Sequence, residues 1–321
     1  MWCILPSVLY KWYRDVLSDY IPDKSAGKYP PKFTENIDQD TGEVVKENPI
    51  YIFKPQNIGN QMSIDDKAIG HDGYTIFSNT KTGKIAMMIE STKSENLCKA
   101  LTLFDKDLSK VKSISCDMDA TYLKLCGEKM PFAKIVIDKF HVMRYVYDAV
   151  LQVRTRIKKE LSEYLSGGKS KTEKDKEILR EISLLKRCLR RLTQSPDKWK
   201  EDTKKLMNQI FRKYKKLKMA YDLSQNFKQW YDINNYKNDK NSIRNNLWNW
   251  CEKVKVSEIE EFRSVVKMIK KHEDEILNYF LSGHTNAAAE RLNGKIQRFV
   301  SANYGTRNKD FSLYRISMYF A

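Results

Sequence analysis

The spacing of hydrophobic and polar positions changes character near residue 140. Between residues 61 and 141, short strand-like runs alternate with runs of helical period. The predicted strands are residues 62–69, 74–77, 84–90, 111–117 and 134–138, and the predicted helices are residues 94–104, 118–126 and a long one from residue 140. Three successive strands followed by alternating helices and strands indicate an α/β fold, a mixed sheet with flanking helices.

Beyond residue 141 the strand-like alternation ends, and helical periodicity continues to about residue 284. The predicted helices are residues 143–165, 173–191, 196–217, 245–253 and 257–281, separated in part by Gly167-Gly168 and by the Asn-rich stretch 234–246. Residues 285–321 then return to a compact motif. We therefore interpret residues 142–284 as a large all-helical insertion between two parts of one fold, residues 61–141 and 285–321.

Residues 1–60 have the weakest pattern. Leucine and tyrosine recur every four residues between residues 2 and 20, which predicts a short amphipathic helix. Residues 22–49 are polar and rich in turn-forming residues, so we expect a linker or an extended arm there. The first residues lack a basic segment and are interrupted by Pro6, and no run approaches the length of a membrane helix. These features predict a cytoplasmic protein.

The overall composition predicts a folded chain. Of 321 residues, 41% are hydrophobic and 12% aromatic, which excludes a disordered protein, and 12 Gly and 8 Pro exclude a fibrous one. The six cysteines include no C-x-x-C pair. Their spacing therefore argues against a zinc module or a disulfide framework and favours a reducing compartment.

Positive charge is concentrated in one region. The formal net charge is +17. Residues 1–141 hold 19 basic and 19 acidic side chains, residues 142–284 hold 33 and 20, and residues 285–321 hold 6 and 2. A basic excess of this size attracts polyanions, most commonly nucleic acid, so we expect phosphate contacts on the helical insertion.

Several carboxylates lie in or at the ends of predicted strands, where a sheet gives way to loops. Asp65 and Asp66 lie in the first predicted strand, Asp117 ends the fourth and Asp138 ends the fifth. Taken singly, such aspartates are more often turn residues. Converging on one sheet edge they would repel one another unless cations lay between them, and hard ions such as Mg²⁺ prefer these oxygen ligands.

The segment 285–298 predicts one further helix with two distinct faces. Ala288, Leu292 and Ile296 form an apolar stripe, whereas Glu290 and Asn293 lie on another face. The Ala287-Ala288-Ala289 run would let this helix lie close to the sheet, so Glu290 could reach a metal held by the aspartates. Lys295 and Arg298 follow one to two turns later and are placed to meet phosphates.

Four ordered motifs together resemble the DDE-type transposases of bacterial insertion sequences. They are Ser63-Ile-Asp65-Asp66, Ile114-Ser-Cys-Asp117, Ile135-Val-Ile-Asp138-Lys-Phe-His141 and Thr285-Asn-Ala-Ala-Ala-Glu290-Arg-Leu-Asn-Gly-Lys-Ile. The similarity runs from about residue 49 to the C-terminus and is greatest to the ISL3-like group, in the Aon-one-type branch. It implies a ribonuclease-H-like mixed sheet with flanking helices, interrupted by a helical insertion before the last acidic residue.

The resemblance also implies roles for individual residues. Asp65, Asp117 and Glu290 match the catalytic and metal-binding triad, which would hold two Mg²⁺ ions, with Mn²⁺ as a substitute. Asp66, Asp138 and His141 match positions that support or orient such a site. The implied activity is metal-dependent cleavage of the DNA element's ends, followed by strand transfer into target DNA.

Candidate DNA contacts come from the residues themselves. The candidates lie in basic clusters at helical spacing in the insertion and on the predicted C-terminal helix. They are Arg187, Arg190, Arg191, Lys215, Lys216, Lys295 and Arg298. Four tryptophans of the insertion, Trp199, Trp230, Trp248 and Trp250, could stack on unpaired bases. The alternative is that the charges are solvated helix faces and the tryptophans are core residues.

One departure from the family pattern concerns the N-terminus. Longer members carry a zinc-binding and helix-turn-helix region, and no Cys/His cluster precedes Gln61. The resemblance therefore implies a separately encoded DNA-binding protein as a partner, beside a homo-oligomer that joins two DNA ends in a synaptic complex. Two alternatives are a catalytically inactive DNA-binding remnant and a structure-specific nuclease. A bacterial, nucleoid-associated location follows from the leading interpretation.

Overall fold

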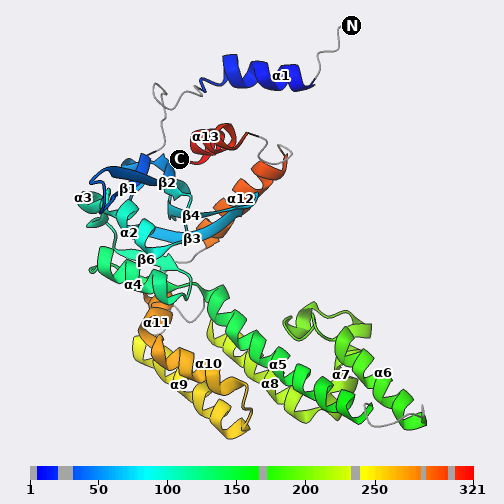
Figure 1. Ribbon diagram of the computed structural model, residues 1–321. Coiled ribbons are helices and arrows are strands. Elements are labelled where there is room, and N and C mark those ends of the chain that lie inside the picture. Colours follow the sequence, from blue (N-terminus) through cyan, green and yellow to red (C-terminus); the bar gives the residue numbers. More distant parts are fainter. Residues whose placement is uncertain (1–5, 21–31, 166–171, 233–238, 283–286, 303–307) are drawn as a thin grey trace. The chain divides into compact units, whose positions relative to one another are not determined.

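The computed structural model describes residues 6–20, 32–165, 172–232, 239–282, 287–302 and 308–321 (Figure 1). Internal contacts divide the chain into two units. The first, here called the sheet unit, is Met1–Asp138 with His284–Ala321, and the second, the helical unit, is Lys139–Gly283. Gly167-Gly168, the start of the Asn-rich stretch and Thr285-Asn286 lie outside the described residues.

The sheet unit is built on seven strands in the order β1-β2-β5-β4-β3-β6-β7. The strands are β1 Lys32–Ile37, β2 Val44–Phe53, β3 Gln61–Ile69, β4 Asp72–Asn79, β5 Lys84–Ile89, β6 Ser113–Cys116 and β7 Lys134–Ile137. Strand β6 pairs in parallel with β3 and with β7, and the other pairs are antiparallel. The five predicted strands and the mixed sheet are confirmed.

Of the two alternatives for residues 22–49, a linker or an extended arm, the linker is wrong for the described part, which consists of extended strands and their connecting turn. Residues 32–37 and 44–49 lie in β1 and β2, which pair with each other and place β1 at the edge of the sheet. Only the later part of β2, from Ile50, pairs with β5. The early part is a two-stranded ribbon with polar residues on both faces, so its sequence lacks the alternation that reveals a half-buried strand.

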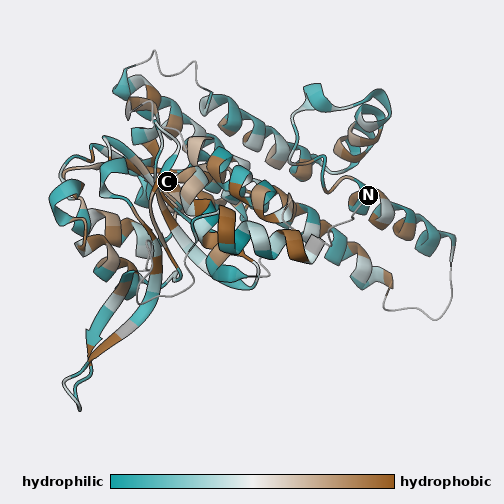
Figure 2. Cartoon of the chain, turned by 90° about the horizontal axis from the view of Figure 1, so that it is seen from above, coloured by the Kyte–Doolittle hydropathy of each residue, from teal (hydrophilic) through white to brown (hydrophobic). Residues whose placement is uncertain are grey.

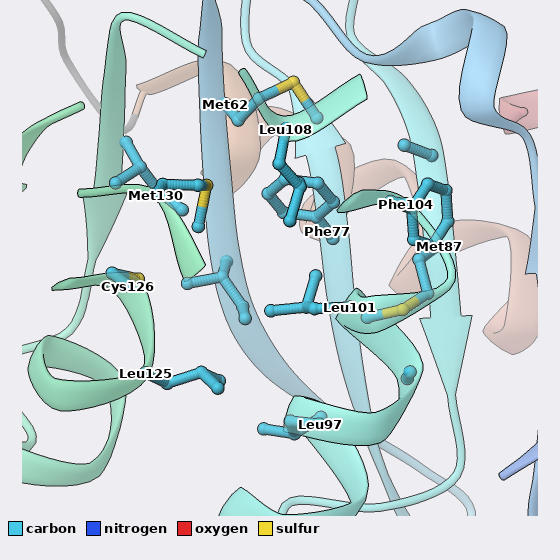
Figure 3. Close-up of a cluster of buried hydrophobic side chains, with 14 of the residues drawn as sticks. Met62, Phe77, Met87, Leu97, Leu101, Phe104, Leu108, Leu125, Cys126 and Met130 are labelled. Atoms are coloured by element: carbon cyan, nitrogen blue, oxygen red, sulfur yellow. The ribbon is translucent and has the colours of Figure 1, made fainter. Parts of the chain in front are cut away.

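Alternation along the strands gives the sheet two apolar faces. On one face, Met62 and Ile64 of β3 pack with α2 (Ser94–Thr102), α3 (Asp105–Leu108) and α4 (Ala120–Lys129). Figure 3 shows Leu97, Leu101, Phe104 and Leu125 in this cluster. Helix α4 begins where the Asp119 side chain accepts a hydrogen bond from the backbone N–H of Thr121.

The opposite face is covered by α12 (Ala287–Ala302) and α13 (Lys309–Phe320). Leu292 and Ile296 of α12 and Leu313 and Ile316 of α13 pack on strand residues that include Ile76. A polar contact fixes the start of α13, because Lys309 Nζ lies 2.9 Å from an oxygen of Asp72 and 2.5 Å from one of Glu90. The C-terminal residues thus complete the core of a unit that began before residue 138.

The N-terminal helical segment also belongs to the sheet unit. Helix α1 (Pro6–Trp12) and the short π-helix Tyr13–Leu17 lie within the helix predicted over residues 2–20, which is confirmed for the described residues. The rings of Tyr10, Tyr13 and Tyr20 surround Phe311 of α13, with centroids 5.1–6.0 Å away. Aromatic packing therefore links the two ends of the chain.

The helical unit contains seven α-helices within its described residues. They are α5 Lys139–Leu165, α6 Glu173–Arg187, α7 Glu201–Lys213, α8 Lys215–Trp230, α9 Lys240–Ser257, α10 Phe262–Lys271 and α11 Glu273–Ser282. Figure 2 shows hydrophilic and hydrophobic residues mixed along the long helices, as expected for amphipathic helices packed on one another. None of the described helices is both long and apolar enough to cross a membrane.

Several helix predictions in this unit are wrong in their extent: α9 is longer than the predicted run 245–253, α6 ends before the predicted residue 191, and two other runs contain breaks. The run 196–217 is divided at Tyr214, whose backbone (φ −107°, ψ 79°) is not helical, and α8 continues to Trp230, beyond the predicted end. The run 257–281 is interrupted at Glu258, which has a left-handed backbone (φ 54°), and again at His272. Apolar periodicity persists across each break, so the pattern alone could not reveal it.

Candidate metal and nucleic-acid site

Strand register aligns three aspartates at one edge of the sheet. Strands β3 and β6 pair in parallel with Ser63 opposite Ser115, so the same register two residues further on aligns Asp65 with Asp117. Strand β7 pairs with β6 at Ile137 and Cys116, which aligns Asp138 with Asp117. The backbone N–H of Asp138 donates to the carbonyl of Cys116 at 3.1 Å. Neighbouring strands lie about 4.8 Å apart, so the three carboxylates start from adjacent backbone positions.

Asp65 and Asp66 point to opposite faces of the sheet, because side chains alternate along a strand. Asp66 shares the face of Met62 and Ile64, which α2–α4 cover. Asp65 shares the face covered by α12, where Ile76, its register partner on β4, also packs. Of the two neighbours, only Asp65 therefore lies on the same face as the C-terminal helix that carries Glu290.

Helix α12 contacts Asp65 through Asn293, whose amide nitrogen donates to Asp65 Oδ2. Burial of Leu292 and Ile296 in the core fixes the rotation of α12 and leaves Asn293 half-buried at the edge of the apolar stripe. Glu290 lies one turn earlier on the same helix and is exposed. The described contact with Asp65 is thus made by Asn293.

The charges of this edge interact strongly. Burial, together with the neighbouring charge of Asp117, raises the pKa of Asp65 to about 6, and the charges of Asp66 and Asp138 make smaller contributions in the same direction. Asp138 itself is buried. Each carboxylate of this cluster disfavours the ionisation of its neighbours. A bound cation would offset this repulsion.

One group of side chains in the described residues has metal-ligand spacing. Asp117, Asp138 and His141, in the first turn of α5, each offer one ligand atom, and these atoms lie within 4.8 Å of one another. Two carboxylates and an imidazole suit a divalent cation. Asp138 and His141, which we expected only to support the site, are therefore placed as possible ligands. Asp65 and Glu290 are not in this group.

Asp66 is held from the other face by two hydroxyl groups. The hydroxyl of Tyr122 on α4 donates to Asp66 Oδ1, and the hydroxyl of Thr75 on β4 lies 2.8 Å from the same oxygen. Thr75 is also 2.7 Å from the carbonyl of Ser91. Burial raises the pKa of Asp66, while the hydrogen bonds from Tyr122 and Thr75 act in the opposite direction. This network fixes β3 directly beside Asp65.

Sequence reasoning missed the partners of Asp66, although part of the signal was present. Thr75 lies directly opposite Asp66 in the β3–β4 hairpin, so counting outward from the turn at Gly70 would have found it. Tyr122 lies on a short amphipathic helix and is indistinguishable there from a core residue. The contact between Asn293 and Asp65 spans 228 positions and requires the tertiary fold.

The predicted cationic contacts differ in their surroundings. Arg187, Arg190, Lys215, Lys216, Lys295 and Arg298 are exposed. None of these six makes a salt bridge with another described residue. Arg191 is half-buried and donates to the Gln194 side chain at 3.1 Å. Six of the seven cations are therefore available to phosphate groups.

Three of the four tryptophans are core residues. Trp199, Trp230 and Trp250 are buried. The ring of Trp199 stacks on that of Tyr221, and the rings of Trp230 and Trp250 pack on Phe227. The indole N–H groups of Trp230 and Trp250 donate to backbone carbonyls. The hypothesis that these three stack on bases is wrong, because no ring face is open. Trp248 is 36% exposed.

Comparison with known families gives a clear assignment. The model of the ISL3-type DDE family, described as a transposase, matches residues 62–316. That match covers most of the chain and spans both parts of the sheet unit and the whole helical unit, so the chain belongs to this transposase family. Transposases act on DNA, which is therefore the partner of the family. No curated protein and no solved structure matches the chain.

Proposed function

We propose that this protein is the catalytic subunit of a DNA transposase, with a ribonuclease-H-like sheet unit interrupted by a DNA-contacting helical unit. The observation that carries the proposal is the parallel register of β3, β6 and β7, which brings together Asp65 in β3 and the aspartates that directly follow the other two strands, Asp117 and Asp138. Helix α12 brings Asn293 to Asp65, and Glu290 lies one turn earlier on the same helix. Carboxylates from neighbouring strands and from a helix near the C-terminus would suit metal-dependent phosphodiester chemistry.

The residues fit a divalent cation, with Mg²⁺ as the expected ion and Mn²⁺ as a substitute. Asp65, Asp117 and Glu290 would hold two ions, with Asp138 and His141 as further candidates. When bound, the ions would supply Lewis-acid activation of water and stabilisation of the leaving oxygen. The raised pKa of Asp65 supports this fit, because a nearby cation would offset the repulsion from Asp117.

The chain's own groups would then orient the reactants. Asn293 fixes one oxygen of Asp65, and the carboxylate would be held in this orientation when it acts as a ligand. Lys295 and Arg298 on α12 would contact phosphates beside the site, and Arg187, Arg190, Arg191, Lys215 and Lys216 would contact DNA further along. The products would be a cut element end and, after attack of its 3′-hydroxyl on target DNA, a joined strand.

The deciding experiment is cleavage of a labelled duplex that carries the end of the protein's own element, in Mg²⁺ or Mn²⁺. Asp117→Asn should reduce nicking by about a hundredfold or more, since even changes beside metal ligands cost about 10–100-fold. Asp119→Asn is the matched control. Asp119 lies two residues from Asp117, and an Asn at this position can still cap α4. Equal activity of wild type and Asp117→Asn would refute the site.

Adding the separately encoded DNA-binding protein tests the proposed partnership. If cleavage requires it, the proposed division of DNA recognition and catalysis between two proteins is supported. If wild type binds DNA but never cuts it, with or without that protein, the inactive-remnant alternative replaces the proposal. Joined products in the presence of target DNA would support strand transfer.

A further inference from the structure

An exposed apolar pair marks the far end of the β1–β2 hairpin. Residues 44–47 pair only with β1, and this part of the hairpin is here called the ribbon (residues 33–47). A two-stranded ribbon extends from the other strands at the lower left of Figure 2. Ile37 and Val44 are cross-strand partners and are 70% and 57% exposed. Isolated ribbons are marginally stable in water, so such a pair gains by being covered.

The ribbon is acidic in a strongly basic chain. Residues 33–47 hold five acidic side chains and one basic one, whereas the whole chain has a net charge of +17. The acidic residues are Glu35, Asp38, Asp40, Glu43 and Glu47. None of them forms a salt bridge with a side chain that the structure describes. This charge disfavours DNA as the occupant and favours a basic protein surface.

The tip of the ribbon is preorganised. Asp38 Oδ1 accepts hydrogen bonds from the backbone N–H groups of Asp40 and Thr41, both at 2.9 Å. The Asp38 backbone is bonded to Glu43 and to Gly42, and Gly42 takes the positive φ of 68° that the turn requires. A rigid tip loses little conformational entropy when it binds.

The chain itself contains a surface of opposite charge. Residues 186–200, here called the basic end of α6, hold six basic side chains and one acidic one. The basic residues are Lys186, Arg187, Arg190, Arg191, Lys198 and Lys200. None of them makes a salt bridge within the described part of the chain. Leu189 lies among them and is 41% exposed. This segment matches the ribbon in two respects, because it has an exposed apolar residue and an excess of the opposite charge.

We propose that the ribbon of one copy binds the basic end of α6 in a second copy. Ile37, Val44 and Leu189 are exposed in a single copy, and a second copy offers each of them an apolar residue beside side chains of opposite charge. Each copy carries both surfaces, so the contact can be made in both directions. Two small contacts of this kind give a transient interface. DNA phosphates would compete for the same arginines.

Charge-reversal complementation tests the contact on DNA-free protein. The ribbon variant is Asp40→Lys with Glu43→Lys, and the basic-end variant is Arg187→Glu with Arg190→Glu. Glu95→Lys with Glu128→Lys is the control for the ribbon variant. It makes the same change of charge at exposed positions of α2 and α4. Sedimentation velocity over roughly 1–100 µM, the range suited to a transient interface, measures self-association.

Wild type and control should self-associate, and each single-surface variant should do so at least about tenfold more weakly. An equimolar mixture of the two variants should regain association, because a basic ribbon then meets an acidic α6 end and the reverse. A monomeric wild type, an unaffected ribbon variant, or a mixture that stays monomeric would overturn the proposal. Circular dichroism of each variant establishes that it is folded. The result is independent of cleavage activity.

Discussion

Replacing Asp65 by Asn should stabilise the protein in the absence of metal and remove its stabilisation by metal. Asn is isosteric with Asp and keeps one oxygen that can accept the hydrogen bond from Asn293. It removes a negative charge that burial and Asp117 disfavour. The substitution thus separates the electrostatic cost of the site from its packing.

The magnitude follows from the raised pKa of Asp65. Its ordinary value is 3.8 and its value in the folded protein is about 6, so between these pH values the folded state binds more protons than the unfolded state. The free energy of unfolding therefore falls as pH rises from about 4 to 6, by up to about 3 kcal/mol, and then stays level. Asn at this position does not titrate. Asp65→Asn should thus be more stable than wild type at pH 8 by up to this amount.

Thermal unfolding in a chelating buffer at pH 4, 5, 6 and 8 measures the effect. For a unit of this size, 1 kcal/mol corresponds to about 2–4 °C, so the variant should melt several degrees above wild type at pH 8 and close to it at pH 4. Added Mg²⁺ or Mn²⁺ should raise the melting temperature of wild type more than that of the variant. Asp119→Asn serves as the control and should follow wild type.

A pH-independent difference between the two proteins would refute this reasoning, as would a variant less stable than wild type at pH 8 without metal. Either result would mean that Asp65 does not bear an unrelieved charge beside Asp117. Equal stabilisation of both proteins by metal would mean that Asp65 does not bind the metal. The conclusion that Asp117 and burial disfavour its charge would be unaffected.

Three further substitutions test other contacts. Asn293→Ala should lower cleavage about 10–100-fold and raise the metal concentration required, measured by nicking in a metal titration, while global stability changes little. Tyr122→Phe leaves Asp66 with one hydroxyl partner fewer and should reduce the free energy of unfolding by about 1–3 kcal/mol in urea denaturation. Lys309→Met should cost about 1 kcal/mol in low salt, because it removes the pairs with Asp72 and Glu90. That loss should shrink in 1 M NaCl; a loss independent of salt would point to packing.

The sequence predicted those parts of the sheet whose hydrophobicity is unambiguous. Strands β3–β7 are short runs bounded by turn residues, so both their positions and the mixed sheet could be predicted from the pattern. The part of β1 and β2 that forms the ribbon was missed because its polar residues lie on both faces and give no regular apolar alternation. The helix breaks at Tyr214 and Glu258 depend on local backbone conformation, which the apolar period does not encode.

The proximity of the strand carboxylates could be predicted from the sequence, whereas their contacts could be predicted only in part. Positions within or at the end of predicted strands singled out Asp65, Asp117 and Asp138. The choice of Asp65 over Asp66 as a ligand remains a prediction, and it agrees with their positions on opposite faces of the sheet. The contact of Asn293 with Asp65 depends on how α12 packs across β3, which no local rule supplies.

The position of the helical unit within the chain has a consequence for synthesis. Its 145 residues separate the three aspartates from α12, and at about 5–20 residues per second the ribosome needs roughly 7–30 s to make them. During this delay the nascent sheet holds its aspartates but lacks the helices that cover Ile76 and its neighbours. A chain under translation therefore exposes an apolar surface of the kind that chaperones bind, and the contact of Asn293 with Asp65 cannot form until α12 has been made.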